Sequence, residues 1–238
     1  MQRRTWIAGT ASLTGMSAMS AMGAMTALTA MTTVLTPARA QTATAPRWWF
    51  IFLETGKPVP DDKAAVEAMQ RGHIENFKKL FGEGKLFAAG PMRDPARQKR
   101  GIVVVQAPDR ETLLSYFQPD EYVREGYMVV NAQPATVHQA LHHTGIDPNG
   151  IEENRIVLFT RAEAQDKAAV PVFLKRALDD GAIGAWYSLE GGPIGEVAFM
   201  RGTDETALRK TMAEYPGLSD QRVTMKIWGQ WLGKGVLR

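Results

Sequence analysis

The stretch GKLFAAGP, residues 84–91, marks the point where a helical pattern gives way to a strand. Gly84 favours a helix end, because glycine readily adopts the left-handed conformation that closes many helices. Residues 86–89 are short and apolar, as expected for a strand, and Gly90 and Pro91 end it. A related stretch, GAIGAWY at 181–187, occurs 97 residues later. The sequence therefore predicts an internal duplication.

The same order of elements is expected on both sides of this duplication. In the first half it is strand, helix, strand, strand, helix, strand, at residues 48–53, 61–84, 86–89, 101–106, 109–117 and 127–133. The second half repeats it at residues 155–161, 166–180, 183–189, 196–201, 204–214 and 223–231. This order is that of a ferredoxin-like unit. We predict an α+β fold with repeats at 41–143 and 155–238, a linker at 144–154, and two antiparallel sheets that cover each other's bare faces.

Residues 1–40 have the features of a removable signal peptide. Arg3 and Arg4 precede a long Ala/Met/Thr/Ser stretch that ends in Ala38-Arg39-Ala40, a small-x-small cleavage pattern. The alternative is a retained membrane anchor, but residues 5–36 hold eleven Ser or Thr and three Gly, so no apolar run of about 20 residues exists. The arginine pair resembles a twin-arginine signal, with the general secretory route as the alternative. We predict a periplasmic or secreted protein that starts at Gln41 and has no stable membrane insertion afterwards.

Charge and composition exclude several function classes. The chain has 28 basic and 25 acidic side chains, and removal of the three leader arginines leaves 25 of each sign. The mature chain therefore lacks the excess of Lys and Arg that nucleic-acid binding requires. Cysteine is absent, which excludes disulfides, thiolate metal sites and cysteine nucleophiles.

Four features in one order make residues 48–133 resemble the YciI-like (YCII-related) family of the dimeric α+β barrel superfamily. They are His73 on the first helix, the Gly-x-Leu-x-x-Ala-Gly-Pro phrase at 84–91, Asp94, and a phrase at 120–126 that begins with Asp120. The family's Asp-Pro-Tyr-Val-x-x-Gly phrase has Glu121 here in place of proline. The resemblance implies that the two repeats close a pseudo-dimeric α+β barrel within one chain.

The resemblance also implies a use for His73 as the proton carrier of a His–Asp pair. Asp120 and Asp94 are the candidate partners, and the activity would be that of a cofactor-independent isomerase or lyase on a small substrate, with a cyclic one among the options. The competing interpretation makes His73 a core residue bonded to a backbone carbonyl, because it lies on the apolar stripe of its helix. Asp94 has an alternative as well, since Asp before Pro95 commonly opens a turn.

Further polar residues are weaker candidates. Arg93 and Arg100 flank the loop after residue 91 and would hold a substrate carboxylate or enolate, unless they form a solvated face. His138 and His142 have metal-ligand spacing only if their segment is helical, and no HExxH pattern supports this, so we expect neither metal nor cofactor. The second repeat has Val170 where His73 aligns and Tyr215 near the Asp120 position, which predicts no equivalent site there.

Three alternatives to an enzyme of this kind stay open. The pocket would serve equally in a non-catalytic module that binds a small-molecule ligand. A haem protein would take its iron ligand from a histidine of the second repeat, but no histidine follows His143. An interaction protein would use sheet edges or helix faces. Both a monomer and a homodimer are compatible with the sequence.

Overall fold

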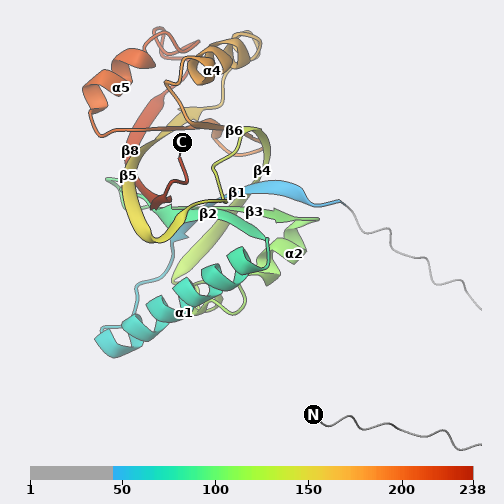
Figure 1. The fold of residues 1–238 in the computed structure, drawn as a ribbon, viewed down its shortest axis with the longest axis vertical. Coiled ribbons are helices and arrows are strands. Elements are labelled where there is room, and N and C mark those ends of the chain that lie inside the picture. Colours follow the sequence, from blue (N-terminus) through green and yellow to red (C-terminus); the bar gives the residue numbers. More distant parts are fainter. Residues whose placement is uncertain (1–44, 238) are drawn as a thin grey trace, which may run out of the picture. The chain divides into compact units, whose positions relative to one another are not determined.

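The computed structural model describes residues 45–237; the predicted signal peptide lies outside this range. The first half contains β1 (Arg47–Thr55), α1 (Lys63–Gly82), β2 (Leu86–Pro91), β3 (Lys99–Ala107), α2 (Arg110–Ser115), α3 (Glu121–Arg124) and β4 (Met128–Gln139). The second half contains β5 (Asp147–Thr160), α4 (Ala169–Asp179), β6 (Ala185–Leu189), β7 (Ile194–Met200), α5 (Glu205–Thr211) and β8 (Met225–Lys234) (Figure 1).

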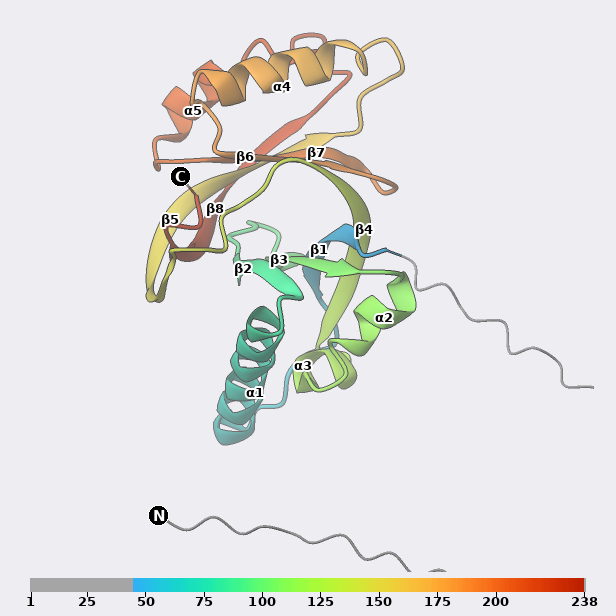
Figure 2. The same cartoon turned by 45° about the vertical axis from the view of Figure 1, so that its right-hand side comes forward.

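The strands form one antiparallel sheet of eight, in the order β2-β3-β1-β4-β6-β7-β5-β8. Each half of this order is a ferredoxin-like sheet, and β4 joins β6 at the first seam between them. At the second seam the bridge between Met92, the residue after β2, and Gln230 of β8 brings the two ends of the sheet together. Figure 2 shows the strands between two helical layers, with α1, α2 and α3 on one side and α4 and α5 on the other. The predicted α+β barrel of two repeats is confirmed.

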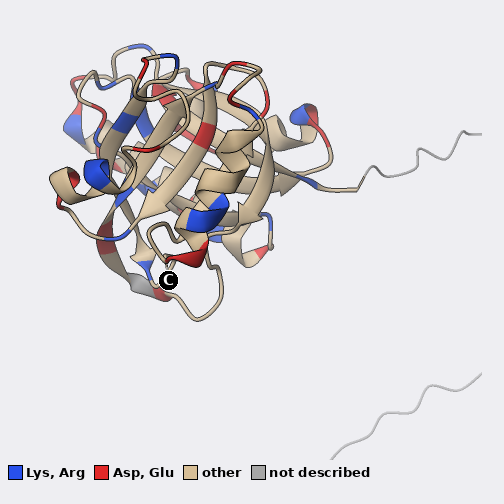
Figure 3. Cartoon of the chain, turned by 90° about the horizontal axis from the view of Figure 1, so that it is seen from above, with Lys and Arg blue, Asp and Glu red and all other residues tan. Residues whose placement is uncertain are grey.

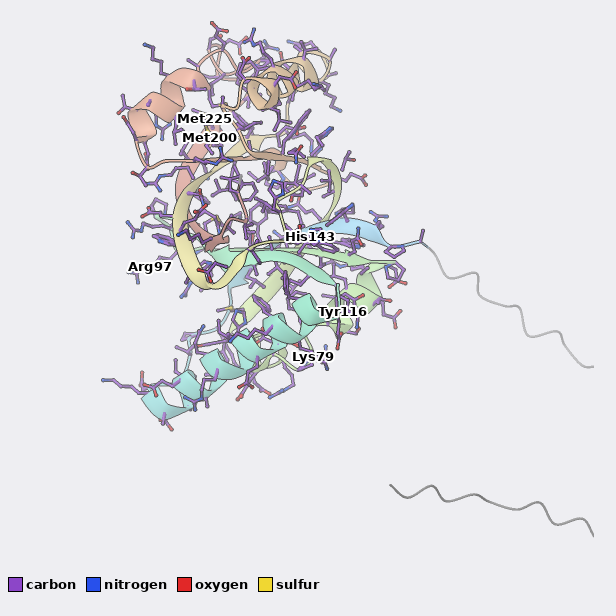
Figure 4. All side chains as sticks on the ribbon, viewed as in Figure 1. Lys79, Arg97, Tyr116, His143, Met200 and Met225 are labelled. Carbon is purple, nitrogen blue, oxygen red and sulfur yellow. The ribbon has the colours of Figure 1, made fainter. Side chains whose placement is uncertain are left out.

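The inward face of the sheet forms a core to which both repeats contribute. Phe50 of β1 is fully buried, and its ring centroid lies 5.5 Å from that of Tyr187 and 6.4 Å from that of Phe199. Alternate residues point outward, where Ile51 packs under the first helical layer and Val157 under the second. Figure 4 shows Met200 and Met225 close to the second layer and Tyr116 close to the first. The central part of the sheet is thus buried on both faces.

Hydrogen bonds at the helix ends show how closely the repeats correspond. The N–H of Lys85 donates to the carbonyl of Leu80 at 2.9 Å, and that of Ala182 donates to Ala177 at 2.8 Å. Both bonds follow a glycine with positive φ, Gly84 or Gly181, which lets the chain turn out of the helix. These residues differ by 97 in number, as the sequence predicted.

The second helical segments correspond equally well, with a different offset. The N–H of Asp120 donates to Phe117 and the N–H of Tyr215 donates to Met212, both at 3.0 Å. These residues differ by 95 in number. The same offset relates Val104 of β3, which pairs with Phe50, to Phe199 of β7, which pairs with Ile156. The structure therefore assigns an equivalent residue in the second repeat to each position around a site in the first.

The predicted linker at 144–154 is wrong from residue 147 onward. Strand β5 begins at Asp147, because the segment pairs with β8, with Asp147 opposite Lys234 and Ile151 opposite Gly233. Strand β4 also runs further than expected and includes His138, so the helix that a metal pair would have needed is absent there. The short helix α3 was not predicted.

Lys and Arg residues are interspersed with Asp and Glu residues over the described part of the chain (Figure 3). Among the helices described, none has both the length and the apolar character needed to cross a bilayer.

Candidate functional site

A pocket of about 490 Å³ lies between α1 and the second seam of the sheet. Its walls come from both repeats and are mostly apolar, with a few polar side chains; they comprise Leu53, Gln70, His73, Ile74, Phe77, Ala89, Gly90, Pro91, Arg100, Gly101, Ile102, Met128, Gly150, Ile151, Trp231, Leu232 and Gly233. This volume and this composition are typical of small-molecule sites.

His73 and Asp120 meet at the wall of this pocket. The Nδ1 atom of His73 lies 2.6 Å from Oδ2 of Asp120, and the two side chains are 10% and 0% exposed. A carboxylate accepts hydrogen bonds, so Nδ1 carries the proton and donates it. This bond leaves Nε2 as the nitrogen available to a ligand. Within residues 45–237, Nε2 has no hydrogen-bond partner.

Local structure fixes both members of the pair. The second carboxylate oxygen of Asp120, Oδ1, accepts the N–H of Tyr122 at 3.0 Å and caps α3. The imidazole packs against the ring of Phe77 at 4.2 Å and faces the edge of Tyr122 at 5.8 Å. His73 lies on the stripe of α1 that faces the sheet, which explains why its position also fitted a core residue. The core interpretation is wrong in one respect: the ring bonds a carboxylate beside a cavity, not a carbonyl.

Asp94, the other candidate partner, lies elsewhere. Its carboxylate accepts the backbone N–H groups of Ala96, Gln98 and Lys99 at 3.0, 3.0 and 2.9 Å. These bonds stabilise the turn before β3, which is the structural interpretation of an Asp-Pro pair. The geometry leaves Asp120 as the partner of His73.

The two arginines differ in their relation to the pocket. Arg100 lies in its wall and, among the described residues, makes no ion pair. Arg93 is placed over the ring of Trp231, 4.9 Å from its centroid, so it supports a wall residue from outside. Burial raises the pKa of Tyr122, and the positive charge of Arg100 partly opposes this effect.

The metal interpretation of the histidines finds no support in the described range, which contains no group of three or more His, Asp or Glu able to hold an ion. His138 stacks on Trp186 at 3.5 Å, and its Nε2 lies 2.8 Å from the hydroxyl of Ser188. His143 contacts the ring of Phe87, near β2 in Figure 4.

Several wall residues were not predicted, namely Gln70, Ile151, Trp231 and Gly233. Three of these come from the second repeat and reach the site only through closure of the barrel. Gly90 shows how tight that closure is, because a Cβ there would lie 1.8 Å from the carbonyl oxygen of Trp231. The duplication was the signal that could have found them, since it implies a second seam opposite the first.

The second repeat has no equivalent of the pair. Val170 and Tyr215 occupy the positions of His73 and Asp120 and belong to one apolar cluster. The hydroxyl of Tyr215 is buried without a hydrogen-bond partner, and burial raises its pKa far above the usual value.

The fold and the pocket define the class as an α+β barrel built from two ferredoxin-like repeats in one chain. Residues 50–132 match the family model of the YCII-related domain, which confirms the resemblance predicted for residues 48–133. A comparison with curated proteins gave no match.

Solved structures with a similar fold cover both repeats. A protein from Fusobacterium nucleatum described as "putative monooxygenase" superposes with a TM-score of 0.54 at 9% identity, over 82% of this chain and 97% of its own. A "putative monooxygenase" from Lactobacillus acidophilus gives 0.48 at 9% identity, over 81% and 98%. A haem-binding protein from Thermus thermophilus gives 0.45 at 11% identity, over 80% and 91%. At this identity the first of these likenesses shows a shared fold.

Proposed function

We propose that the pocket is an acid–base active site in which His73 moves a proton to or from a small ligand. The observation that carries the proposal is the 2.6 Å contact between His73 Nδ1 and Asp120 Oδ2 at the wall of a cavity. A histidine whose second nitrogen is held by a buried carboxylate has a fixed tautomer and a stabilised cationic form.

The chemistry follows from this geometry. The Nε2 atom takes a proton from a carbon of the ligand next to a carbonyl, and Asp120 stabilises the imidazolium that forms. The guanidinium of Arg100 faces the negative charge that develops on the carbonyl oxygen. Return of the proton to another carbon gives an isomerisation, and loss of a leaving group gives an elimination. Neither reaction needs a redox step.

The proposal is tested by deuterium exchange into small keto acids and lactones in deuterated water, followed by NMR. Wild-type protein should exchange the proton next to the carbonyl of at least one compound. His73→Gln should lower that rate by about 10²- to 10⁴-fold, because general acid–base catalysis contributes this much. His143→Gln, a histidine outside the pocket, should leave the rate unchanged. Equal rates in wild type and His73→Gln would overturn the proposal. Ligand binding without exchange would favour the non-catalytic module.

We also propose that the protein works outside the cytoplasm, because residues 1–40 combine a basic start, a weakly apolar stretch and a small-x-small site. N-terminal sequencing of exported protein should begin at Gln41. If the twin-arginine route is used, replacement of Arg3-Arg4 by Lys-Lys should block export. Mature protein that still begins at Met1 would contradict the proposal.

A further inference from the structure

Part of the space that forms the pocket in the first repeat is occupied by large side chains in the second, where Trp186 and His138 line the base of a more open hollow beside α4. The offsets of 97 and 95 pair Ala89 with Trp186 and Gly101 with Glu196. The offset of 95 also pairs Gly233 with His138, since Gln133 of β4 faces Phe50 as Trp228 of β8 faces Ile156. All of these positions point outward at a seam, toward α1 or α4. At three equivalent positions the second seam has a small residue and the first seam has a large one.

At the first seam the side chains of Trp186, Glu196 and His138 pack together in one group, which we call the plug. The indole of Trp186 is 2% exposed, and its Nε1 donates to Oε2 of Glu196 at 2.6 Å. The same oxygen accepts the hydroxyl of Ser188 at 2.7 Å. The imidazole of His138 lies flat on the indole at 3.5 Å, with 11° between the planes. A planar ring therefore fits between the helix and the sheet at this place in the fold.

At the second seam the same space is open and carries different polar groups. Ala89, Gly101 and Gly233 leave room for a ring above the sheet. The side chain of Trp231 does not fill this space, because its ring is directed along β8 toward Gly229, where it lies 3.4 Å from the position that a Cβ would take. Arg100, which is equivalent to Gly195, adds a positive charge, and no Asp or Glu lines the pocket.

We propose that the pocket binds a planar, ring-bearing anion, with its ring in the place that the Trp186 indole has in the second repeat and its acidic group toward Arg100. The apolar walls provide the affinity for the ring, and the unpaired guanidinium selects for a carboxylate or another anion. This inference names the ligand class of the proposed active site. Binding of the anion does not depend on the proposed function, but its role as the substrate of His73 does.

The test is a binding titration with three probes: indole-3-carboxylate, neutral indole, and cyclohexanecarboxylate, an anion that is not planar. Indole-3-carboxylate should bind wild-type protein most tightly. Arg100→Gln should weaken its binding by about tenfold or more, because a charge-assisted hydrogen bond is lost, and should leave indole unaffected. Ala89→Trp should abolish binding of all three probes, since it rebuilds the plug. Val172→Trp, at an exposed position of α4, is the matched control and should bind as wild type does.

The outcomes separate the two proposals. Full binding to Ala89→Trp, or equal affinity for the planar and the non-planar anion, would overturn the inference. His73→Gln that binds indole-3-carboxylate normally but lacks proton exchange would support both proposals. Exchange activity with no binding of any planar anion would retain the proposed function and refute the ligand class. Binding of the planar anion, with no effect of His73→Gln on exchange, would retain the ligand class and refute the proposed function.

Discussion

The two seams of the barrel are equivalent by position, yet only one of them is continuous. At the first seam Ala135 pairs with Leu189, and the ladder continues through Thr136 with Ser188 and Val137 with Tyr187. At the second seam the pair Met92 and Gln230 corresponds to the pair Leu189 and Ala135. This bridge is isolated, because no neighbouring pair of described residues continues it into a ladder.

The position after that bridge accounts for the difference. Pro91 stands where the first seam has Ser188, and proline has no N–H to donate to a ladder. The side chain of Gln230 donates to the carbonyl of Gly90 at 3.0 Å, so a side chain supplies a contact that backbone supplies elsewhere. The comparison teaches that a duplicated fold can keep a continuous ladder at one seam and an interrupted one at the other, where the pocket beside His73 lies.

The largest effect is expected from a change that tests whether the repeats are independent. Phe50→Ala should lower the free energy of unfolding by about 3–5 kcal/mol, because it removes a fully buried ring. Since Phe50 contacts rings of the second repeat, both halves should unfold in one transition. Chemical denaturation followed by circular dichroism and tryptophan fluorescence measures this. Two separate transitions would show that each repeat has a core of its own.

A smaller contrast is expected at the equivalent positions Asp120 and Tyr215. Asp120→Ala should cost about 2 kcal/mol, because it removes the cap of α3 and leaves His73 without its partner. Tyr215→Phe should change the stability by less than about 1 kcal/mol, and toward greater stability, since it deletes a buried hydroxyl that has no partner. Thermal unfolding of the two variants beside wild type gives both values. Equal losses would mean that the two positions carry similar interactions.

The smallest effect concerns the plug and depends on pH. Burial raises the pKa of Glu196, although its bonds from Trp186 and Ser188 oppose the shift. An acid whose pKa is raised in the folded state binds protons more tightly there than in the unfolded chain. Stability is therefore lost as the pH rises past the ordinary glutamate range, and the loss is complete above the folded-state pKa.

Glu196→Gln should accordingly be slightly more stable than wild type at pH 7, by less than about 1 kcal/mol. The difference should disappear at pH values below the ordinary glutamate range, where the wild-type carboxyl is protonated in both states. Urea denaturation at several pH values measures the trend. A gain that is constant with pH would exclude ionisation of Glu196 as its cause.

Part of the site was predictable because it depends on local patterns. His73 falls on the apolar stripe of its helix, and Asp120 begins a recognisable phrase, so each could be singled out before any contact was known. The choice between Asp120 and Asp94 was not predictable. Both are buried carboxylates near turns, and only the packing of α3 against α1 brings one of them to the imidazole.

The sequence by itself determined the order of the strands and longer helices, the duplication and the approximate helix ends, because hydrophobic period, glycine and proline act over a few residues. Only the tertiary structure decided which seam opens and what lines it. Gly233 lies 132 residues after Gly101, and no local pattern links it to Ala89 or Gly101. They form a pocket because the barrel closes β8 onto β2, and this closure depends on long-range packing that no local pattern records.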